Sequence, residues 1–533
     1  MQTHSIQNFN KIYPCCRKIV GPDSWKKIIS ACGKKSPDTF WQCLLDMHKT
    51  LAFPDYLPTL SHVEWVLFST QTADTVIPRH IEYIDLNPTL EVLKLNWILT
   101  PLFKSLESDK PVLPTKGKEF ALIWRDPATD RVKIKGASSD ELLAIKLIVE
   151  SIRPEQAAES GELTTAQIES IMLKVVRSGI LIGPASKIRR PDSRIAHRKD
   201  IPEKFISASH FTLQWHITNA CDLHCKHCYD RTKRSPLTLR QGNKILDNLY
   251  SFCKENHVQG HVCLTGGNPF LSPHFVPLYK KAKDLGFSTS ILGNPVPREE
   301  LQKIVSIQQP DYYQVSLEGL PSHNDLIRGP ENFSRVIEFL GVLRDLHITS
   351  AVMLTLTRDN MDQILPLAEL LRGHVDRFTF NRLSPVGEGA NLRLPEPEAY
   401  VEFLKNYIDE AATNPILGFK DNLINIELQN RGRKPFGGCT GFGCGAAFNF
   451  IAILPDGEVY ACRKFPSYIG NAFDQSIAEI YNSDAAQKYR NGTTACQECA
   501  LQAVCSGCFC MTYGVGDDIF TARDPYCFIG SKM

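Results

Sequence analysis

The sequence predicts an α/β protein whose centre is a partial barrel of six strands and six helices, a (β/α)6 arrangement. Two observations predict this fold class. Between residues 209 and 392, strand-like segments alternate six times with amphipathic helical segments, which is typical of a parallel sheet covered by helices. Twelve of the 18 cysteines fall in two clusters, one inside this region and one in a cysteine-rich C-terminal extension.

Changes in composition divide the chain into six expected regions. A chain of 533 residues is too long for one hydrophobic core. The regions are 1–108, a helical N-terminal domain; 109–184, a winged-helix-like domain; 185–208, a basic linker; 209–392, the partial barrel; 393–435, a helical bridge; and 436–533, the cysteine-rich extension.

The overall charge and hydropathy exclude two classes of partner. With a net charge of +2, the chain lacks the strong positive field of a nucleic-acid-binding protein. Its first residues contain no apolar signal-peptide core, and no uncharged apolar run reaches the ~18 residues that span a bilayer. We therefore expect a cytoplasmic protein without a membrane or nucleic-acid partner. In such a protein, many cysteines indicate metal ligation rather than a disulfide framework.

The region 109–184 combines a hairpin with two helices, which at this size form a winged-helix arrangement. The expected strands are Glu119–Trp124 and Arg131–Lys135, joined by a turn rich in Pro and Asp. Each helix begins with a capping box, Ser138 with Glu141 and Thr164 with Gln167. The second helix buries Ile168, Ile171, Val175 and Val176 and ends at Gly179. The basic residues of 185–208 show no periodicity and are expected to face solvent.

Six strands are expected in the partial barrel, with helices outside. The strands are Phe211–Thr218, Val262–Thr265, Ser288–Leu292, Tyr313–Leu317, Thr349–Thr357 and Asp376–Phe380. One outer helix is expected to bury Phe333, Val336, Ile337, Leu340 and Leu343. Cys253 on a helix and Cys263 inside a strand are interpreted as core residues rather than ligands.

Cys221, Cys225 and Cys228 follow the first barrel strand at CxxxCxxC spacing. Three thiolates at this spacing can hold three irons of a 4Fe-4S cluster, whereas clusters that only carry electrons usually have four thiolate ligands. One iron is then left open, and an open position lets a bound metal bind and activate a substrate. On their own, three cysteines also fit part of a zinc site, or a redox-active pair next to a third cysteine that takes no part.

Residues near the ends of two later strands suit a charged ligand. Gly266 and Gly267 let backbone approach a ligand closely, and Asn268 offers a hydrogen-bond acceptor. Ser316 lies on the fourth strand, and Arg328 follows it with a guanidinium fork that matches a carboxylate. The carboxyl ends of strands are where α/β barrels place their sites.

Together with the three cysteines, these motifs resemble those of the radical SAM enzymes, which use S-adenosyl-L-methionine (SAM). The resemblance implies that SAM chelates the open iron through its amino and carboxylate groups. It also implies that Gly266, Gly267 and Asn268 stand for the GGEP motif that meets the SAM amino group, with Asn268 in place of the usual Glu. Ser316 would contact the SAM ribose or methionine, and Arg328 would pair with its carboxylate.

The C-terminal cysteines fit two four-thiolate sites around an expected hairpin at 448–460. Their spacing resembles the SPASM extension of the same enzymes. It implies a first auxiliary 4Fe-4S cluster on Cys439, Cys444, Cys462 and either Cys508 or Cys510, and a second on Cys496, Cys499, Cys505 and Cys527. The family's three-residue gap after Cys505 is absent, which leaves the choice between Cys508 and Cys510 open. A pair of zinc sites is the alternative.

Next to this chemistry, the region 109–184 resembles the PqqD-like precursor-recognition domain, which binds a leader peptide as an added strand at its sheet edge. Winged helices in general more often bind DNA. The leading hypothesis is a radical SAM peptide maturase that modifies a ribosomally made precursor peptide with a leader. The product would be a thioether or another side-chain cross-link, and a flavodoxin or ferredoxin would be the electron donor.

Two other hypotheses are a sulfatase-maturase-like formylglycine-generating enzyme and a non-catalytic iron–sulfur scaffold that binds peptide. Sulfatase maturases place an acidic base shortly after the equivalent of Cys462, whereas Arg463, Lys464 and Phe465 follow it here. A scaffold without turnover would need vestigial SAM motifs, yet the glycines, Ser316 and Arg328 are all present.

Overall fold

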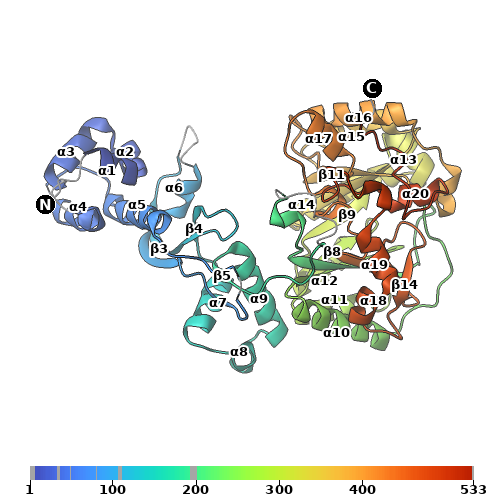
Figure 1. Cartoon of the computed structure of the whole chain (residues 1–533), viewed down its shortest axis with the longest axis horizontal. Helices are drawn as coiled ribbons and strands as arrows, with labels where there is room; N and C mark the ends of the chain where they lie inside the picture. Colours follow the sequence, from blue (N-terminus) through green and yellow to red (C-terminus); the bar gives the residue numbers. More distant parts are fainter. Residues whose placement is uncertain are drawn as a thin grey trace. The chain divides into compact units, whose positions relative to one another are not determined.

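The computed structural model describes residues 6–32, 36–48, 50–79, 81–105, 111–191 and 201–530. It divides into two compact units, one up to Ala185 and one from Ser186 onward, which are described separately (Figure 1). None of the helices in the described ranges is both long enough and apolar enough to cross a membrane.

The first unit begins with a helical bundle around an aromatic core. Phe9, Tyr13 and Phe40 are fully buried there, with ring centroids 4.7 to 5.7 Å apart. A disulfide joins Cys32 to Cys43. The helices are α1 (Ile6–Ile12), α2 (Pro14–Val20), α3 (Pro22–Cys32), α4 (Phe40–Met47) and α5 (Leu57–Thr72).

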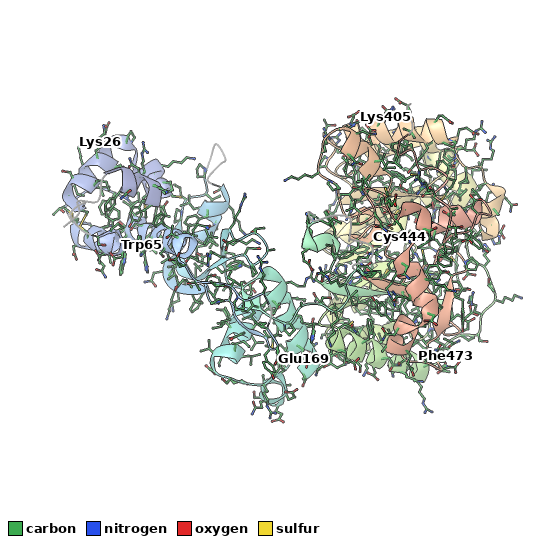
Figure 2. All side chains as sticks on the ribbon, in the orientation of Figure 1. Lys26, Trp65, Glu169, Lys405, Cys444 and Phe473 are labelled. Carbon is green, nitrogen blue, oxygen red and sulfur yellow. A yellow bond between two sulfur atoms is a disulfide. The ribbon has the colours of Figure 1, made fainter. Side chains whose placement is uncertain are left out.

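A three-stranded antiparallel sheet follows in the first unit, in the order β2 (Glu91–Ile98), β3 (Thr115–Arg125), β4 (Val132–Gly136). Side chains on both faces of the central strand β3 are packed against helices. Leu122 and Trp124 join the core of helices α7 (Ser139–Val149) and α9 (Thr165–Ser178), whereas Ala121 and Ile123 join α5. Trp65 of α5 packs against the core that contains Ala121 and Ile123 and also against the aromatic core of the helical bundle (Figure 2). The remaining elements are α6 (Thr100–Ser105), α8 (Pro154–Ser160) and the short pair β1 (Asp85–Leu86) and β5 (Leu181–Ile182).

The strand β2 corrects the expected boundary at residue 108. Because β2 pairs with β3, a boundary there divides the sheet. Leu93, Leu95 and Trp97 alternate with polar residues, a strand period that the general helical pattern of the preceding residues obscured. The hairpin and both capping boxes of this unit are confirmed, and Gly179 ends α9 with a left-handed φ of 80°.

The six expected barrel strands of the second unit are confirmed. They form one parallel sheet in the order of the chain (Figure 1). The strands are β6 (His210–Thr218), β7 (Gln259–Gly266), β8 (Ser288–Leu292), β9 (Tyr312–Ser316), β10 (Ser350–Leu356) and β11 (Arg377–Arg382). The helices between them are α10 (Leu239–Glu255), α11 (Phe275–Asp284), α12 (Arg298–Ile307), α13 (Pro321–Arg328), α14 (Asn332–Asp345) and α15 (Ile364–Leu371).

The two faces of this sheet differ in polarity. Side chains of successive residues on a strand point to opposite faces, and one set joins the large apolar core with the helices, for example Val262, Leu264, Tyr313 and Val315. The other set is largely polar. Cys263 belongs to it: this cysteine is buried as expected, but Ser290, Arg463 and Lys420 are its neighbours. The expectation that Cys263 is a buried core residue is therefore confirmed, although polar and charged groups lie near it.

The C-terminal extension continues the barrel sheet. Its strand β12 (Phe450–Ile453) pairs in parallel with β6, and β13 (Glu458–Tyr460) and β14 (Tyr468–Asn471) extend the sheet to nine strands. Gly457 takes a left-handed φ of 84° at the predicted turn. The other helices of this part are α16 (Pro397–Glu410), α17 (Ile424–Asn430), α18 (Ile477–Asn482), α19 (Asp484–Asn491) and α20 (Phe509–Gly514).

The expected linker at 185–208 packs onto the second unit wherever it is described, and residues 192–200 lie outside the described ranges. Ile188 and Phe205 are buried in the large core. Arg190 is only 3% exposed and donates to the carbonyl oxygens of Phe442 (2.7 Å) and Cys444 (2.5 Å). The expectation that these basic residues face solvent is wrong for Arg190, because its guanidinium satisfies buried carbonyls beside a predicted cluster ligand.

Candidate functional site

The loop with Cys221, Cys225 and Cys228 leaves the carboxyl end of β6 and is held by three neighbouring segments. The backbone N–H groups of Gly267 and Asn268 donate to the carbonyls of residues 218 and 220, at 2.9 and 2.8 Å. On a second side, Lys226 N donates to Ile327 O of α13 (3.0 Å), and on a third, Glu388 N donates to Cys228 O (2.9 Å). The loop is thereby fixed at the site-bearing end of the sheet.

Gly266 and Gly267 are required by this contact. A Cβ on Gly266 would lie 2.1 Å from Thr218 O, and one on Gly267 would lie 2.0 Å from Ala220 O. Gly266 also has a φ of 124°, a backbone angle that residues other than glycine rarely adopt. The close approach predicted for these glycines is thus made to the backbone of the cysteine loop.

Asn268 takes part in a polar network at the start of the cysteine loop. Its Nδ2 donates to Asp222 Oδ1 (3.1 Å). Asn294, which follows β8, donates to the same oxygen (2.7 Å) and also to Cys221 Sγ (3.6 Å). Asn268 uses its donor side on Asp222, and its Oδ1 accepts from the backbone N–H of Phe270 (3.4 Å).

Glu318 is the centre of the site. It follows β9, is 1% exposed, and its Oε1 accepts from Arg328 Nε (2.9 Å) and Nη2 (2.6 Å). The same oxygen lies 3.0 Å from His227 Nε2, and Oε2 accepts from Thr355 N (2.7 Å). Burial alone raises the pKa of this carboxyl, but His227, Arg328 and the backbone N–H lower it to about 2. Glu318 is consequently ionised and joins α13, β10 and the cysteine loop.

The contact with Glu318 limits what Arg328 can do for a ligand. Its Nε and Nη2 edge is occupied by the carboxylate, and Nη1 points to Cys225 Sγ at 3.8 Å. A second carboxylate can reach Arg328 only through the remaining donors, so the bidentate fork of Nε and Nη2 is not available to it. Ser316, at the end of β9, is half-buried beside this group.

The three cysteines of the loop fit a cluster of thiolate-bound irons. N–H donors are directed at two of the sulfurs, from Asn294 to Cys221 and from Arg328 to Cys225, and such donors stabilise thiolate ligands. Burial raises the pKa of Cys225, Arg328 lowers it, and the thiols of Cys221 and Cys228 are close enough to raise it again.

A second group of thiols lies in the C-terminal extension (Figure 2). Burial raises the pKa of Cys444 to about 12, with contributions from Cys508, Cys462 and Cys439. Burial likewise raises that of Cys462 to about 11, and Cys508 and Cys439 contribute again. Cys439, Cys444, Cys462 and Cys508 are thus near one another, and Cys508 and Cys462 also lie near Cys510.

Cys510 has other partners. It lies on α20, is 2% exposed, and its thiol donates to Ser384 Oγ (3.0 Å) and lies 3.4 Å from Lys464 O. Cys508 precedes the helix, after a tight turn in which both Ser506 and Gly507 have left-handed φ values of 58° and 63°. This turn accommodates the short gap between Cys505 and Cys508.

A third group consists of Cys499, Cys505 and Cys527. Burial raises the pKa of Cys505, and Cys527 contributes; burial also raises that of Cys527, and Cys499 contributes. Cys496 is near Cys499 in the chain and is buried. Within the described ranges, no three histidine, cysteine or carboxylate side chains come close enough together to hold a single metal ion.

Sequence reasoning missed Glu318, His227, Asp222 and Asn294. Each lies within two residues of a strand end or a cysteine, which was the available signal. Their roles depend on contacts between residues 10 to 101 apart, and no local pattern encodes these.

Comparisons with known proteins agree with this geometry. The family model of the radical SAM superfamily matches residues 215–371, and that of SPASM, an iron–sulfur cluster-binding domain, matches 444–509. The first match contains the loop cysteines and Glu318, and the second begins at Cys444.

Two curated relatives cover this part of the chain. The antilisterial bacteriocin subtilosin biosynthesis protein AlbA of Bacillus subtilis is 27% identical over 318 residues, which are 55% of this chain and 66% of AlbA. The mycofactocin maturase MftC of Mycolicibacterium smegmatis is 28% identical over 338 residues, 60% of this chain and 82% of MftC.

A solved structure shares the fold. The crystal structure of Streptococcus suis SuiB bound to precursor peptide SuiA aligns with a TM-score of 0.50 and 18% identity, covering 77% of this chain and 96% of SuiB.

Replacing Glu318 by glutamine should destabilise the second unit. Glu318→Gln leaves the buried Arg328 without a counter-charge, and breaking a buried ion pair in this way costs about 3 to 5 kcal/mol. Urea denaturation of the iron-free protein measures the loss. Glu369→Gln is a matched control, because Glu369 pairs with Arg372 at the surface and exposed pairs contribute at most about 1 kcal/mol. Equal midpoints for the two variants would contradict the role of Glu318.

Proposed function

We propose that this chain, a radical SAM enzyme that carries a SPASM domain, modifies a ribosomally made precursor peptide and forms a thioether or another side-chain cross-link in it. The observation that carries the proposal is the three-thiol loop held against the glycine motif and Glu318, within one sheet shared with the SPASM thiols. Relatives named for the biosynthesis of a bacteriocin and for mycofactocin maturation support a peptide substrate.

The residues of the site fit an iron–sulfur cluster with SAM at its open iron. When bound, that pair would supply the radical chemistry that removes a hydrogen from an unactivated substrate carbon. Cys221, Cys225 and Cys228 would hold the cluster. Asn294 and Arg328 orient its thiolates, and the loop at 266–268 holds the start of the cysteine loop in place.

Contacts to SAM itself are assigned by resemblance and by position. Gly266, Gly267 and Asn268 face the SAM amino group, and Asp222 beside Asn268 supplies the charge that the motif otherwise carries. Ser316 binds the ribose or methionine part. Arg328 contacts the SAM carboxylate through Nη1, since Glu318 holds its other edge.

For the auxiliary clusters, we assign Cys439, Cys444, Cys462 and Cys508 to the first and Cys496, Cys499, Cys505 and Cys527 to the second. The electrostatic proximity of Cys508 to Cys444 and Cys462 supports the first set. Cys510 is then not a cluster ligand, and its thiol donates a hydrogen bond to Ser384 Oγ.

We assign leader recognition to the sheet of the first unit, as the PqqD-like resemblance implies. Among the residues that the structure describes, its edge strands β2 and β4 have a strand partner on one side only, so their outward main-chain groups are able to pair with an added peptide strand. Three helices, α7, α8 and α9, follow the three strands.

Coexpression with a precursor peptide tests the proposed function. A peptide encoded beside the gene, isolated after anaerobic coexpression, should lose two hydrogens per cross-link, as seen by mass spectrometry. The matched control changes Cys221, Cys225 and Cys228 together to Ala, which should leave the peptide unmodified. An unchanged peptide mass with the intact, iron-loaded enzyme would contradict the proposal.

Iron content should distinguish Cys508 from Cys510. Anaerobically reconstituted protein should hold about twelve irons, four for each of three clusters. Cys508→Ala should lower the iron content and change the cluster's electron paramagnetic resonance spectrum, because the first auxiliary cluster loses a ligand. Cys510→Ala is the matched control and should keep both. The reverse result would make Cys510 the ligand.

Removing the first unit should uncouple peptide binding from SAM cleavage. Deletion of residues 1–185 should leave SAM cleavage without peptide largely intact and weaken leader affinity tenfold or more, because recognition and radical generation lie in separate domains. Fluorescence anisotropy with a labelled leader measures the affinity. A deletion of 1–208 is the comparison: it also removes Ile188, Arg190 and Phe205 and should destabilise the remainder. Unchanged leader affinity in the shorter deletion would place recognition in the second unit.

A further inference from the structure

The polar face of the barrel sheet is reached by a positively charged side chain from the C-terminal extension. Arg463, directly after the cluster cysteine Cys462, donates from Nη1 to Thr265 Oγ1 at 3.2 Å. Thr265 lies on β7 immediately before the glycine motif. Arg463 therefore extends from the SPASM domain to the same end of the sheet as the SAM motifs.

The other neighbours of Arg463 confirm this position. Burial lowers the pKa of His216 on β6 to about 3, and Arg463 lowers it further. Burial raises the pKa of Tyr312 on β9 to about 12, while Arg463 opposes the shift. Arg463 thus lies near three strands, and its Nε and Nη2 have no hydrogen-bond acceptor among the residues that the structure describes.

Three more cations lie in this part of the molecule, with Lys420 as the common neighbour of Arg463, Lys464 and Arg377. Burial lowers the pKa of Lys420 to about 8, and Lys464, Arg463 and Arg377 contribute to the decrease. Lys420 also lies near Cys263 on β7, as Arg463 does. Both Lys420 and Arg463 are half-buried. The four side chains therefore form one cationic group beside the polar face of the sheet.

No carboxylate in the described ranges forms an ion pair with any of these four cations. The nearest acidic side chains are occupied by other cations: Asp230 pairs with Arg234 (3.6 Å), Glu318 with Arg328, and Asp421 with Arg382 (2.7 Å). A half-buried cation without a carboxylate partner is available to a bound anion.

We propose that Arg463, assisted by Lys420, binds a carboxylate of the peptide substrate next to the residue that is modified. This inference rests on the proposed function. An acidic side chain or a C-terminal carboxylate provides the same chemistry. The auxiliary cluster is the other negative charge nearby. Lys464 adjoins Cys462 and opposes its raised pKa, Cys462 contributes to the raised pKa of Arg463, and Cys439 opposes the lowered pKa of Lys420. Arg463 differs in that its Nη1 is also directed at Thr265 on the sheet.

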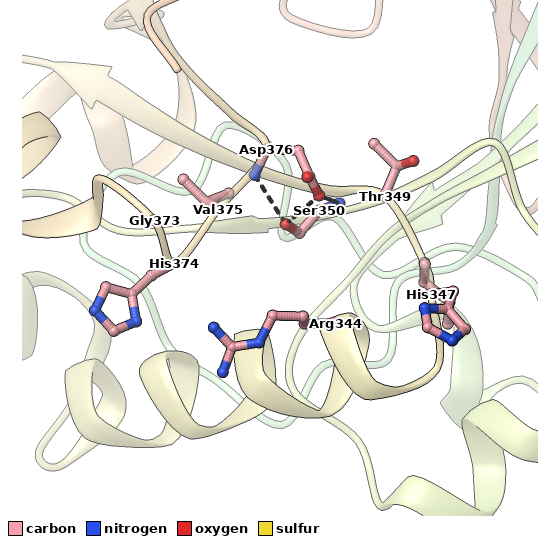
Figure 3. A pocket seen from close by; sticks show the side chains of 9 residues that line it. Arg344, His347, Thr349, Ser350, Gly373, His374, Val375 and Asp376 are labelled. Carbon is pink, nitrogen blue, oxygen red and sulfur yellow. Dashed lines mark hydrogen bonds between the residues drawn. The ribbon is translucent and has the colours of Figure 1, made fainter. Parts of the chain in front are cut away.

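A surface hollow elsewhere on the barrel provides a control for loss of charge. It lies at the amino ends of β10 and β11, opposite the SAM motifs, and is lined by Arg344, His347, His374 and Asp376 (Figure 3). Asp376 is engaged by Ser350, and Arg344 is exposed. Arg344→Gln removes the same charge as Arg463→Gln without touching the cationic group.

Binding of two small probes tests the proposal without turnover. N-acetyl-glutamate α-amide carries one carboxylate, and N-acetyl-glutamine α-amide is its neutral match. Isothermal titration of the reconstituted full-length protein with SAM, in buffer without competing small anions, should show at least about tenfold tighter binding of the acidic probe, the contribution of one charge-assisted hydrogen bond.

The variants identify the site. Arg463→Gln and Lys420→Met should each reduce the preference for the acidic probe, Arg463→Lys should keep part of it, and Arg344→Gln should keep all of it. Iron content confirms that each variant is folded and loaded. Equal binding of the two probes to the wild type, no binding of either, or an unchanged preference in Arg463→Gln would overturn the inference. If the acidic probe is preferred but coexpressed peptide stays unmodified, the proposed function fails and the carboxylate site remains.

Discussion

The site depends on one buried carboxylate. Glu318 accepts four hydrogen bonds or ion-pair contacts, from Arg328, His227 and the backbone of Thr355. These partners belong to α13, to the cysteine loop and to β10, so one charge sets the position of three segments. The cost of burying it is offset only because both oxygens are fully used. Arg328 in turn directs an N–H at Cys225, and the geometry of a cluster-binding thiol is thereby fixed by an acid that is not itself a ligand.

The parallel core could be predicted from the sequence, and the contacts of the site could not. Residues 288–292 were expected as a strand and form β8 with the same bounds, because alternation and flanking turns are local signals. Glu318 gave no such signal: an acid after a strand is usually a solvated charge, and only the fold brings Arg328 and His227 to it. Arg190 was misread for the same reason, since its acceptors lie more than 250 residues away. The strand at 91–98 was missed although its alternation was present, because the helical pattern before it dominated.

The SPASM domain is structurally part of the barrel. Its strand β12 adds to β6, the strand that leads into the cysteine loop, and Arg234 after that loop pairs with Asp456 and Glu458 on the following hairpin, each at 2.8 Å. At the other end of the barrel sheet, Arg382 of β11 is held by Asp421 and Asp524, which lies beside Cys527. The thiols of the C-terminal extension are therefore tied to the same sheet as the cysteine loop and the glycine motif.

The spacing of the last cysteines shows how a departure from a family pattern is absorbed locally. A gap of two residues after Cys505 replaces the usual three. Two consecutive left-handed residues, Ser506 and Gly507, reverse the chain within that gap. Cys505 then faces Cys527, whereas Cys508 faces Cys444 and Cys462. The left-handed turn therefore lets the chain go from Cys505 to Cys508 with one residue fewer than the usual gap. Cys510, the second residue of α20, lies near Cys508 and Cys462 as well, but its thiol donates a hydrogen bond to Ser384 Oγ.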